Sequence, residues 1–155
     1  MSEPEAGHNW LKGCTCFRLR RTARRMTQVY DHHLAAVDLT LTQYSLLANL
    51  VRREPPSVHA LAALMGMDRT TVTRTLKPLI GRGLLRLEAG ADRRSRHIVV
   101  SPAGQALWDQ AKPLWRAAQT EIETRLGPAE TADLHRLLDQ SFARLGEEHP
   151  EMLRP

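Results

Sequence analysis

The sequence of 155 residues is poor in cysteine, with only Cys14 and Cys16, which are separated by one residue. This pair cannot build the disulfide framework of a small secreted protein, so we expect a reducing cytoplasm. No hydrophobic run reaches transmembrane length, and none near the N-terminus is long enough for a signal peptide. We therefore expect a cytoplasmic protein that has no membrane partner and folds as one domain with a substantial core.

Signatures of catalysis are also missing. The sequence contains no glycine-rich phosphate loop, no serine or cysteine nucleophile motif and no paired carboxylates in a pocket-like context. His32 and His33 are adjacent, which is not a recognisable spacing of metal ligands. These absences predict that the protein is not an enzyme, with no catalytic residue, no cofactor and no metal site.

Positive charge is present in moderate excess. Lysine and arginine total 22 against 17 aspartate and glutamate residues, which gives a net charge of +5 at pH 7, and most of the cations are arginines. Arginine suits bidentate contacts to phosphate groups and guanine edges. Many mildly basic proteins never bind nucleic acid, so a net positive charge alone does not indicate nucleic-acid binding. The positions of the charges in the sequence are the stronger evidence.

Two short helices in the middle of the chain have the pattern of a helix-turn-helix. Ser57 caps a helix over 58–65 that Gly66 closes, and Asp68 caps a second helix that runs to about Arg82. The apolar face of the second helix consists of Val72, Leu76, Leu79 and Ile80. Its other face carries hydrogen-bond donors and no carboxylate, as a DNA-reading helix requires: Arg69, Thr70, Thr71, Thr73, Arg74 and Lys77. Pro78 should bend its C-terminal end.

A β-hairpin follows this helix. Residues 84–88 and 96–100 have strand character, and the segment 89–95 between them is polar and basic. We interpret the hairpin as a wing that contacts DNA through four residues: Asp92, Arg93, Arg94 and Arg96. An ordinary charged surface turn is the alternative interpretation, as an ordinary solvated face is for the helix.

The remaining helices flank this unit. Residues 8–37 read as one long helix, Thr40 and Gln43 form a capping box that opens another, and Ser101-Pro102 begins a helical region to residue 146. Their apolar stripes exceed what one small wing domain can bury, so we expect a homodimer. The predicted fold is mainly α with a small β-hairpin wing. It comprises a single domain over 1–155, with a winged helix-turn-helix lobe over 38–101 and a helical dimerisation region over 8–37 and 102–146.

This order of elements resembles the MarR family of bacterial regulators over nearly the whole chain. The family shows Asp-x-Arg, five residues, Leu-Thr, two residues and Gly at the wing. Here the motif reads Asp92-Arg93-Arg94, Ser95 to Val99, Val100-Ser101, Pro102-Ala103 and Gly104, with conservative changes at the Leu-Thr pair. The segment from Met67 to Arg74 also looks like the start of the family's recognition helix.

The resemblance implies a regulator that binds double-stranded DNA. By resemblance, Arg94 enters the minor groove, Asp92 orients an arginine, and Arg93 and Arg96 contact phosphates. It further implies a repressor that binds a near-palindromic operator as a homodimer and is released by a small-molecule effector, such as an aromatic acid. An architectural DNA-binding protein is a second hypothesis, but the sequence lacks intercalating apolar wedges and a much higher charge.

The two cysteines allow a third reading, a thiol-based peroxide-sensing repressor that uses Cys16. Cys16-Phe17 resembles the reactive position of that branch of the family, and Tyr30 matches one tyrosine that contacts the cysteine there. Arg20 and Leu41 replace two other tyrosines of that branch. Buried structural thiols in the dimer region, and metal binding with His8, are the alternatives for Cys14 and Cys16.

A run of arginines crosses the first helix: Arg18, Arg20, Arg21, Arg24 and Arg25. Because these residues wrap most of the helix, they do not form a single DNA-facing stripe. We expect them to pair with acidic residues of the terminal helices, such as Glu121 and Glu123. An arginine that lines an anion pocket is the alternative.

Overall fold

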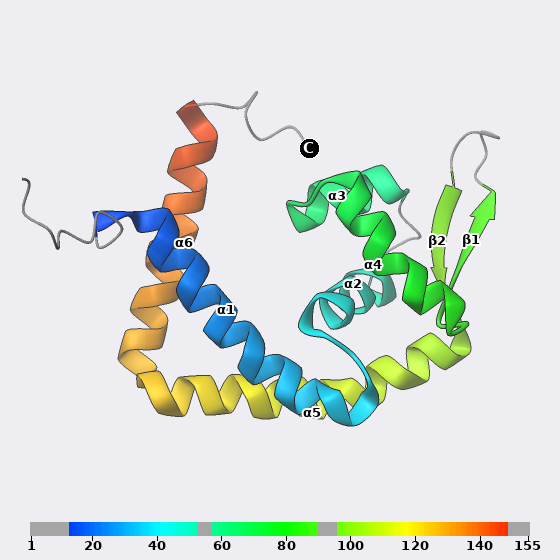
Figure 1. Cartoon of the computed structure of the whole chain (residues 1–155), viewed down its shortest axis with the longest axis horizontal. Helices are drawn as coiled ribbons and strands as arrows, with labels where there is room; N and C mark the ends of the chain where they lie inside the picture. The colour runs from blue at the N-terminus through cyan, green and yellow to red at the C-terminus, as the bar shows by residue number, and fades with distance from the viewer. Residues whose placement is uncertain (1–12, 53–56, 90–95, 149–155) are drawn as a thin grey trace, which may run out of the picture.

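The computed structural model describes residues 13–52, 57–89 and 96–148, and it gives backbone only for 96 and 146–148. Within these ranges the chain is mainly α with one antiparallel hairpin, as predicted (Figure 1). The elements in order are α1 (Thr15–Leu34), η2 (Ala35–Val37), α2 (Leu41–Val51), α3 (Val58–Met65), α4 (Arg69–Gly81), β1 (Leu85–Ala89), β2 (Arg96–Val100), α5 (Pro102–Leu126) and α6 (Pro128–Glu148).

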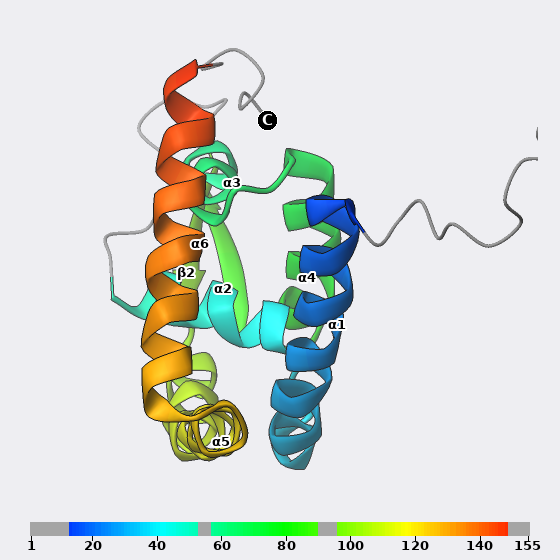
Figure 2. The ribbon, with the colours of Figure 1, turned by 90° about the vertical axis from the view of Figure 1, so that its left-hand side faces the viewer.

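The molecule has a lobe and an arm, and the arm consists of α1, α5 and α6. The long helix α5 runs along the base, α1 packs against it, and α6 rises from its far end, while α2, α3, α4 and the hairpin form the lobe at the other end (Figure 1). The view turned by 90° shows α1 and α6 standing apart above α5 (Figure 2). Taken singly, no helix of the described ranges is long and apolar enough to cross a membrane. The segments Thr15–Val37 and Leu41–Val51 meet that requirement only as a pair, which is bent by 72°.

Four predicted helix starts are confirmed by their caps. The side chains of Thr40, Ser57, Asp68 and Ser101 each accept a hydrogen bond from the backbone N–H three residues later. Gln43 completes the capping box, because its Oε1 accepts the Thr40 N–H at 2.9 Å. Each cap satisfies a backbone donor that the helix itself leaves unpaired.

Three boundaries differ from the sequence-based prediction. Helix α1 was expected over 8–37, but Cys14 caps it and it ends at Leu34, while residues 8–12 lie outside the described ranges. The chain then tightens into η2, because Leu39 is buried and its N–H returns to the Leu34 carbonyl oxygen. Strand β1 begins one residue later than predicted, and α6 continues to Glu148.

The core lies in the lobe and under the α1–α5 contact. Its largest fully buried side chains come from α1, α2, α3, α4 and β2: Leu34, Leu46, Leu47, Leu61, Val72, Leu79 and Ile98. The predicted apolar face of α4 is buried at Val72, Leu76 and Leu79 and partly buried at Ile80. Helix α6 contributes little to this core and instead exposes four large apolar side chains: Leu137, Leu138, Phe142 and Leu145.

Gly104 explains the last position of the wing motif. A Cβ atom built on it would lie 2.2 Å from the Leu84 carbonyl oxygen, a backbone atom that cannot turn away. The first turn of α5 therefore approaches the end of the α4–β1 connection more closely than any side chain permits. This close approach fixes α5 against the base of the hairpin.

We expect Gly104→Ala to destabilise the protein by about 1–3 kcal/mol, since the backbone must move to relieve the clash. Urea unfolding monitored by circular dichroism measures the change. Gly81→Ala is the matched control, because a Cβ on this helical glycine meets nothing within 4 Å. It should leave stability unchanged or raise it slightly, and equal losses in the two variants would contradict the steric explanation.

Candidate nucleic-acid interface

The turn between α3 and α4 sets the direction of the second helix. Gly66 ends α3 in a left-handed conformation (φ 60°), and the Met67 N–H bonds to the Ala62 carbonyl oxygen at 2.9 Å. Asp68 then caps α4, accepting the backbone N–H of Thr71 at 2.8 Å and its hydroxyl at 2.6 Å. These two hydrogen bonds hold the pKa of the Asp68 carboxyl below its usual value, and the one from the Thr71 hydroxyl has the larger effect.

One face of α4 carries a row of exposed donors. Five of the six residues predicted to contact DNA from this helix line a shallow hollow of about 650 Å³: Arg69, Thr70, Thr73, Arg74 and Lys77. No carboxylate of the described residues pairs with these cations. Their spacing of three and four residues places them on one stripe of the helix. The face therefore offers cationic and hydroxyl donors to an acceptor outside the chain.

Thr71 differs from the rest of the predicted set. It is half-buried, and its hydroxyl donates to Asp68 rather than pointing out with the row. Within the chain, Thr71 therefore stabilises the N-terminal cap of α4. For the hydroxyl to donate a hydrogen bond to DNA, it must leave Asp68.

The hairpin is held firmly at its base. Strands β1 and β2 pair with Leu85 opposite Val100 and Ala89 opposite Arg96, so Arg96 stands where the pairing ends. The Ser101 hydroxyl donates to the Gly83 carbonyl oxygen at 2.7 Å, and Ile98 is buried in the core. Arg86 and Glu88 form an ion pair of 2.7 Å on β1. The remaining predicted wing residues, Asp92, Arg93 and Arg94, lie outside the described residues.

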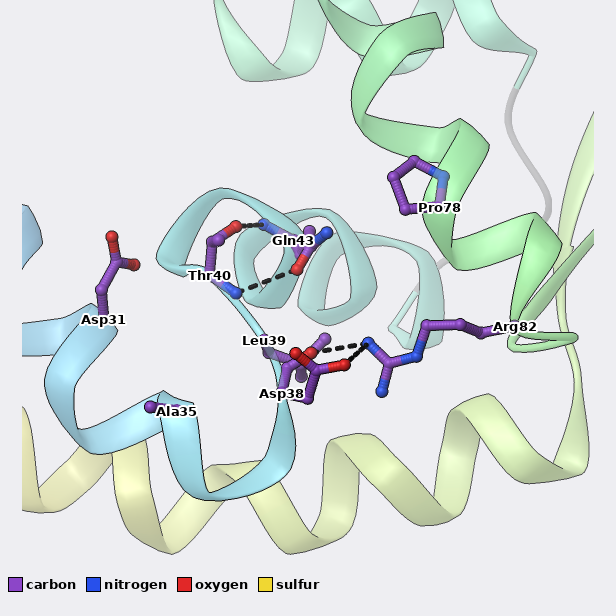
Figure 3. A pocket seen from close by; sticks show the side chains of 8 residues that line it. All are labelled: Asp31, Ala35, Asp38, Leu39, Thr40, Gln43, Pro78 and Arg82. Carbon is purple, nitrogen blue, oxygen red and sulfur yellow. Dashed lines mark hydrogen bonds and ion pairs between the residues drawn. The ribbon is translucent and has the colours of Figure 1, made fainter.

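A contact between Arg82 and Asp38 links the end of α4 to the connection between α1 and α2. The sequence analysis did not predict this contact. Arg82, directly after α4, donates from Nη1 to the carbonyl oxygen of Asp38 at 2.6 Å and lies 3.5 Å from its carboxylate (Figure 3). Asp38 holds a left-handed conformation (φ 51°) between η2 and α2. A cavity of about 430 Å³ opens beside this contact, with Pro78 of α4 on its wall. The contact ties the recognition helix to the α1–α2 connection.

Cys14 and Cys16 lie at the N-terminal end of α1. The Sγ of Cys14 caps α1 by accepting the Phe17 N–H at 3.4 Å, and Cys16 is exposed in the first turn. Tyr30 lies fourteen residues further along the same helix, which corresponds to about 21 Å. Its hydroxyl donates to Gln119 and its ring stacks on Trp115. A single chain does not bring Tyr30 to Cys16, and thiol sensing stays a prediction.

The acidic residues expected to pair with the α1 arginines have other partners. Glu121 binds His33 at 2.7 Å and Arg125 at 2.6 Å, and Glu123 accepts from Gln119. Within the described residues of one chain, the pairing expected with Glu121 and Glu123 is therefore not formed by Arg20, Arg21, Arg24 or Arg25, because Glu121 instead binds His33 and Arg125. The hydrogen bond from His33 and, to a smaller extent, the charge of Arg125 hold the pKa of Glu121 below its usual value, although desolvation acts in the opposite direction. Four arginines have no ion pair among the described residues: Arg20, Arg21, Arg24 and Arg25.

A helix-turn-helix with a donor-lined second helix, followed directly by a hairpin, defines a winged-helix DNA-binding protein. Comparison with known proteins narrows this class. The family model described as "MarR family" matches residues 37–95. The chain is 38% identical to the M. tuberculosis transcriptional regulator MosR, in a crystal structure with DNA. The match covers 84% of this chain and 97% of MosR, with a TM-score of 0.72.

Two further solved structures give the same assignment. The transcriptional repressor CouR, bound to a 23-mer DNA duplex, is 27% identical over 90% of this chain and 98% of its own, with a TM-score of 0.77. A probable transcriptional regulator from Pseudomonas aeruginosa is 27% identical over 84% and 98%, with the same TM-score. The chain belongs to the MarR family of transcriptional regulators.

Proposed function

We propose that the protein is a repressor that binds a near-palindromic operator as a homodimer and is released by a small-molecule effector. The observation that carries the proposal is the row of Arg69, Thr70, Thr73, Arg74 and Lys77 on α4, which faces outward with no carboxylate partner in the described part of the chain. Two relatives with this fold, MosR and CouR, have solved structures in complex with DNA.

The row suits the major groove in both reach and chemistry. Arginine can bind the O6 and N7 atoms of guanine with two hydrogen bonds, and threonine hydroxyls can reach base edges or phosphates. Arg69 and Thr70 occupy the first turn of α4, where a recognition helix meets the bases, while Lys77 lies two turns later and is suited to a phosphate. We assign Arg74, between them, to a base edge.

The partner of the arm is a second copy of the chain. Phe142 and Leu145 of α6 are 76% and 71% exposed, which is unusual for large apolar side chains on the same face of a helix. The exposed carboxylates Glu130 and Asp139 of α6 have the opposite charge to the α1 arginines that form no ion pair among the described residues: Arg20, Arg21, Arg24 and Arg25. Two copies related by a two-fold axis can cover the apolar face and pair these charges across it.

A two-fold dimer predicts the form of the DNA site. Footprinting of the promoter of its own gene should reveal two inverted half-sites whose centres lie about 10 base pairs, one helical turn, apart. In a gel shift, affinity for this site should exceed that for random DNA by roughly a thousandfold or more. Equal affinity for both DNAs would favour an architectural protein, and a lone asymmetric half-site would contradict the dimeric docking.

A further inference from the structure

The C-terminal end of α4 is held by a contact from outside the lobe. Arg82 follows α4 directly, and its Nη1 donates to the carbonyl oxygen of Asp38 at 2.6 Å. Asp38 lies in the connection that leads from α1 of the arm into α2 of the lobe (Figure 3). The contact therefore joins the helix that carries the exposed row of donors to the end of an arm helix.

The main acceptor in this contact is the backbone carbonyl group of Asp38, not its carboxylate. The carboxylate lies 3.5 Å from Nη1, and the Asp38 side chain is 93% exposed, so water weakens the ion pair. A guanidinium that donates to a carbonyl oxygen at 2.6 Å forms a charge-assisted hydrogen bond. The contact should thus survive the loss of the Asp38 side chain, provided that the backbone keeps its conformation.

The backbone of Asp38 is fixed in the conformation that presents this carbonyl oxygen. Its φ of 51° is left-handed, and its N–H bonds to the Ala35 carbonyl oxygen at 3.1 Å. Leu39, the next residue, is buried, and its N–H returns to the Leu34 carbonyl oxygen at 3.3 Å. The position of the acceptor is therefore set by the end of α1.

Pro78 weakens the last turns of α4. A proline has no backbone N–H, so the helix lacks the hydrogen bond that residue 78 would otherwise give to the Arg74 carbonyl oxygen. Pro78 also lines the cavity of about 430 Å³ beside the contact, so packed side chains do not support the helix on that side. Arg74 and Lys77 of the exposed row lie next to this weakened point. Their direction depends on how the end of α4 is held.

We propose that Arg82 is a positioning residue for DNA recognition, which acts through the Asp38 carbonyl oxygen and holds α4 at the angle at which its exposed row reads bases. Without this contact, the end of α4 can tilt toward the cavity, and only a fraction of the molecules present the row correctly. The apparent affinity for a specific sequence then falls in proportion to that fraction. Contacts to phosphates are less sensitive to the tilt, because they carry no sequence information.

A dimer makes the angle of α4 more important. Each lobe is joined to its own arm by its own α1–α2 connection, and both recognition helices must meet their half-sites at a fixed separation. Because two-fold symmetry repeats every contact, a tilt of α4 affects operator binding in both lobes. The inference rests on the proposed function as an operator-binding dimer.

Two substitutions break the contact from opposite sides. Arg82→Gln removes the donor. Asp38→Val keeps the donor but disfavours the left-handed conformation, which a β-branched residue rarely adopts, and the exposed position offers the new side chain no packing. Asp38→Gly is the matched control, because it loses the same carboxylate while glycine adopts the left-handed conformation freely. It should keep the contact.

Operator and random DNA together measure the effect. A gel shift across a salt series compares the operator duplex identified by footprinting with a random duplex of the same length. We expect Arg82→Gln and Asp38→Val each to weaken operator binding about tenfold or more, as the loss of a charged hydrogen bond does. Random binding, which depends on phosphates, should change less than about twofold, with the same salt slope. The double variant should lose no more than either single variant, because both break one contact.

Hydrogen exchange gives a readout that needs no DNA. The backbone N–H groups that follow Pro78, from Leu79 to Leu84, should exchange faster in Arg82→Gln and Asp38→Val than in the unaltered protein and in Asp38→Gly. Circular dichroism and light scattering show whether each variant keeps its fold and its oligomeric state. If Asp38→Val does not fold, Arg82→Gln and Asp38→Gly still decide the test.

Four results would overturn the proposal. If Arg82→Gln keeps its full affinity for the operator, α4 does not need the contact. If it weakens both DNAs and lowers the salt slope by about one, Arg82 binds a phosphate directly. If folded Asp38→Val binds as the unaltered protein does, or Asp38→Gly loses as much as Arg82→Gln, Arg82 does not act through the carbonyl oxygen. An equal loss on both DNAs at constant slope indicates general destabilisation.

Failure of the proposed function would look different. The unaltered protein would then show no preference for any operator before a variant is tested. In that case the exchange rates after Pro78 alone show whether Arg82 holds the end of α4, and unchanged rates in Arg82→Gln would contradict that as well.

Discussion

Leu138→Asp is expected to convert the protein into a monomer that no longer binds its operator. Leu138 is 40% exposed on the apolar face of α6, between residues that are more exposed still. If a second copy covers this face, burial of the part of each leucine that is still exposed contributes about 1 kcal/mol, and two-fold symmetry doubles the loss. The new carboxylate must also be desolvated without a partner. The dimer dissociation constant should rise by about three orders of magnitude or more.

Loss of operator binding follows from loss of the dimer. Two linked recognition helices bind two half-sites with an effective concentration that separate monomers cannot reach. Light scattering coupled to size-exclusion chromatography measures the mass, and a gel shift measures the DNA affinity. Gln140→Asp is the matched control, because it adds the same charge on the opposite, polar side of α6, and it should stay dimeric.

Either of two outcomes would contradict this reasoning. A Leu138→Asp protein that remains a dimer would show that α6 does not form the interface. A monomer that keeps full operator affinity would show that the two half-sites are not bound by a dimer. Circular dichroism must show an intact fold, which is expected because Leu138 lies outside the buried core.

The lobe was predictable because its determinants are local. Ser57 and Asp68 cap helices through residues three positions away, and Gly66 ends α3 by its own left-handed conformation. Such signals lie within one turn of the boundary that they define. The face of α4 was equally legible, since Val72, Leu76 and Leu79 recur at helical spacing and all three are buried.

The contacts that position the site were not predictable, because they join residues far apart in the sequence. Arg82 reaches Asp38 across 44 positions, and His33 takes Glu121 across 88. Charge alone allowed any of the α1 arginines to pair with Glu121, and the packing of α1 on α5 selected His33 instead.

Arg74→Ala and Arg94→Ala are expected to impair DNA binding in different ways. Arg74 projects from the middle of the exposed row of α4, where we assign it to a base edge. Its loss should cost about 1–3 kcal/mol on the operator and relax the preference at one base step, with less effect on random DNA. Arg94, a wing residue outside the described ranges, is assigned to the minor groove by the family resemblance. Its loss should weaken operator and random DNA together.

Salt dependence separates the two effects. Each phosphate contact releases counterions, so removing Arg94 should lower the slope of log affinity against log salt by about one. Removing a base-reading Arg74 should change the slope less and the ratio between operator and random DNA more. Arg136→Ala on α6 is the control and should alter neither quantity. If both Arg74→Ala and Arg94→Ala bind both DNAs as the unaltered protein does, with their folds intact, then α4 and the wing do not contact DNA and the proposed function fails.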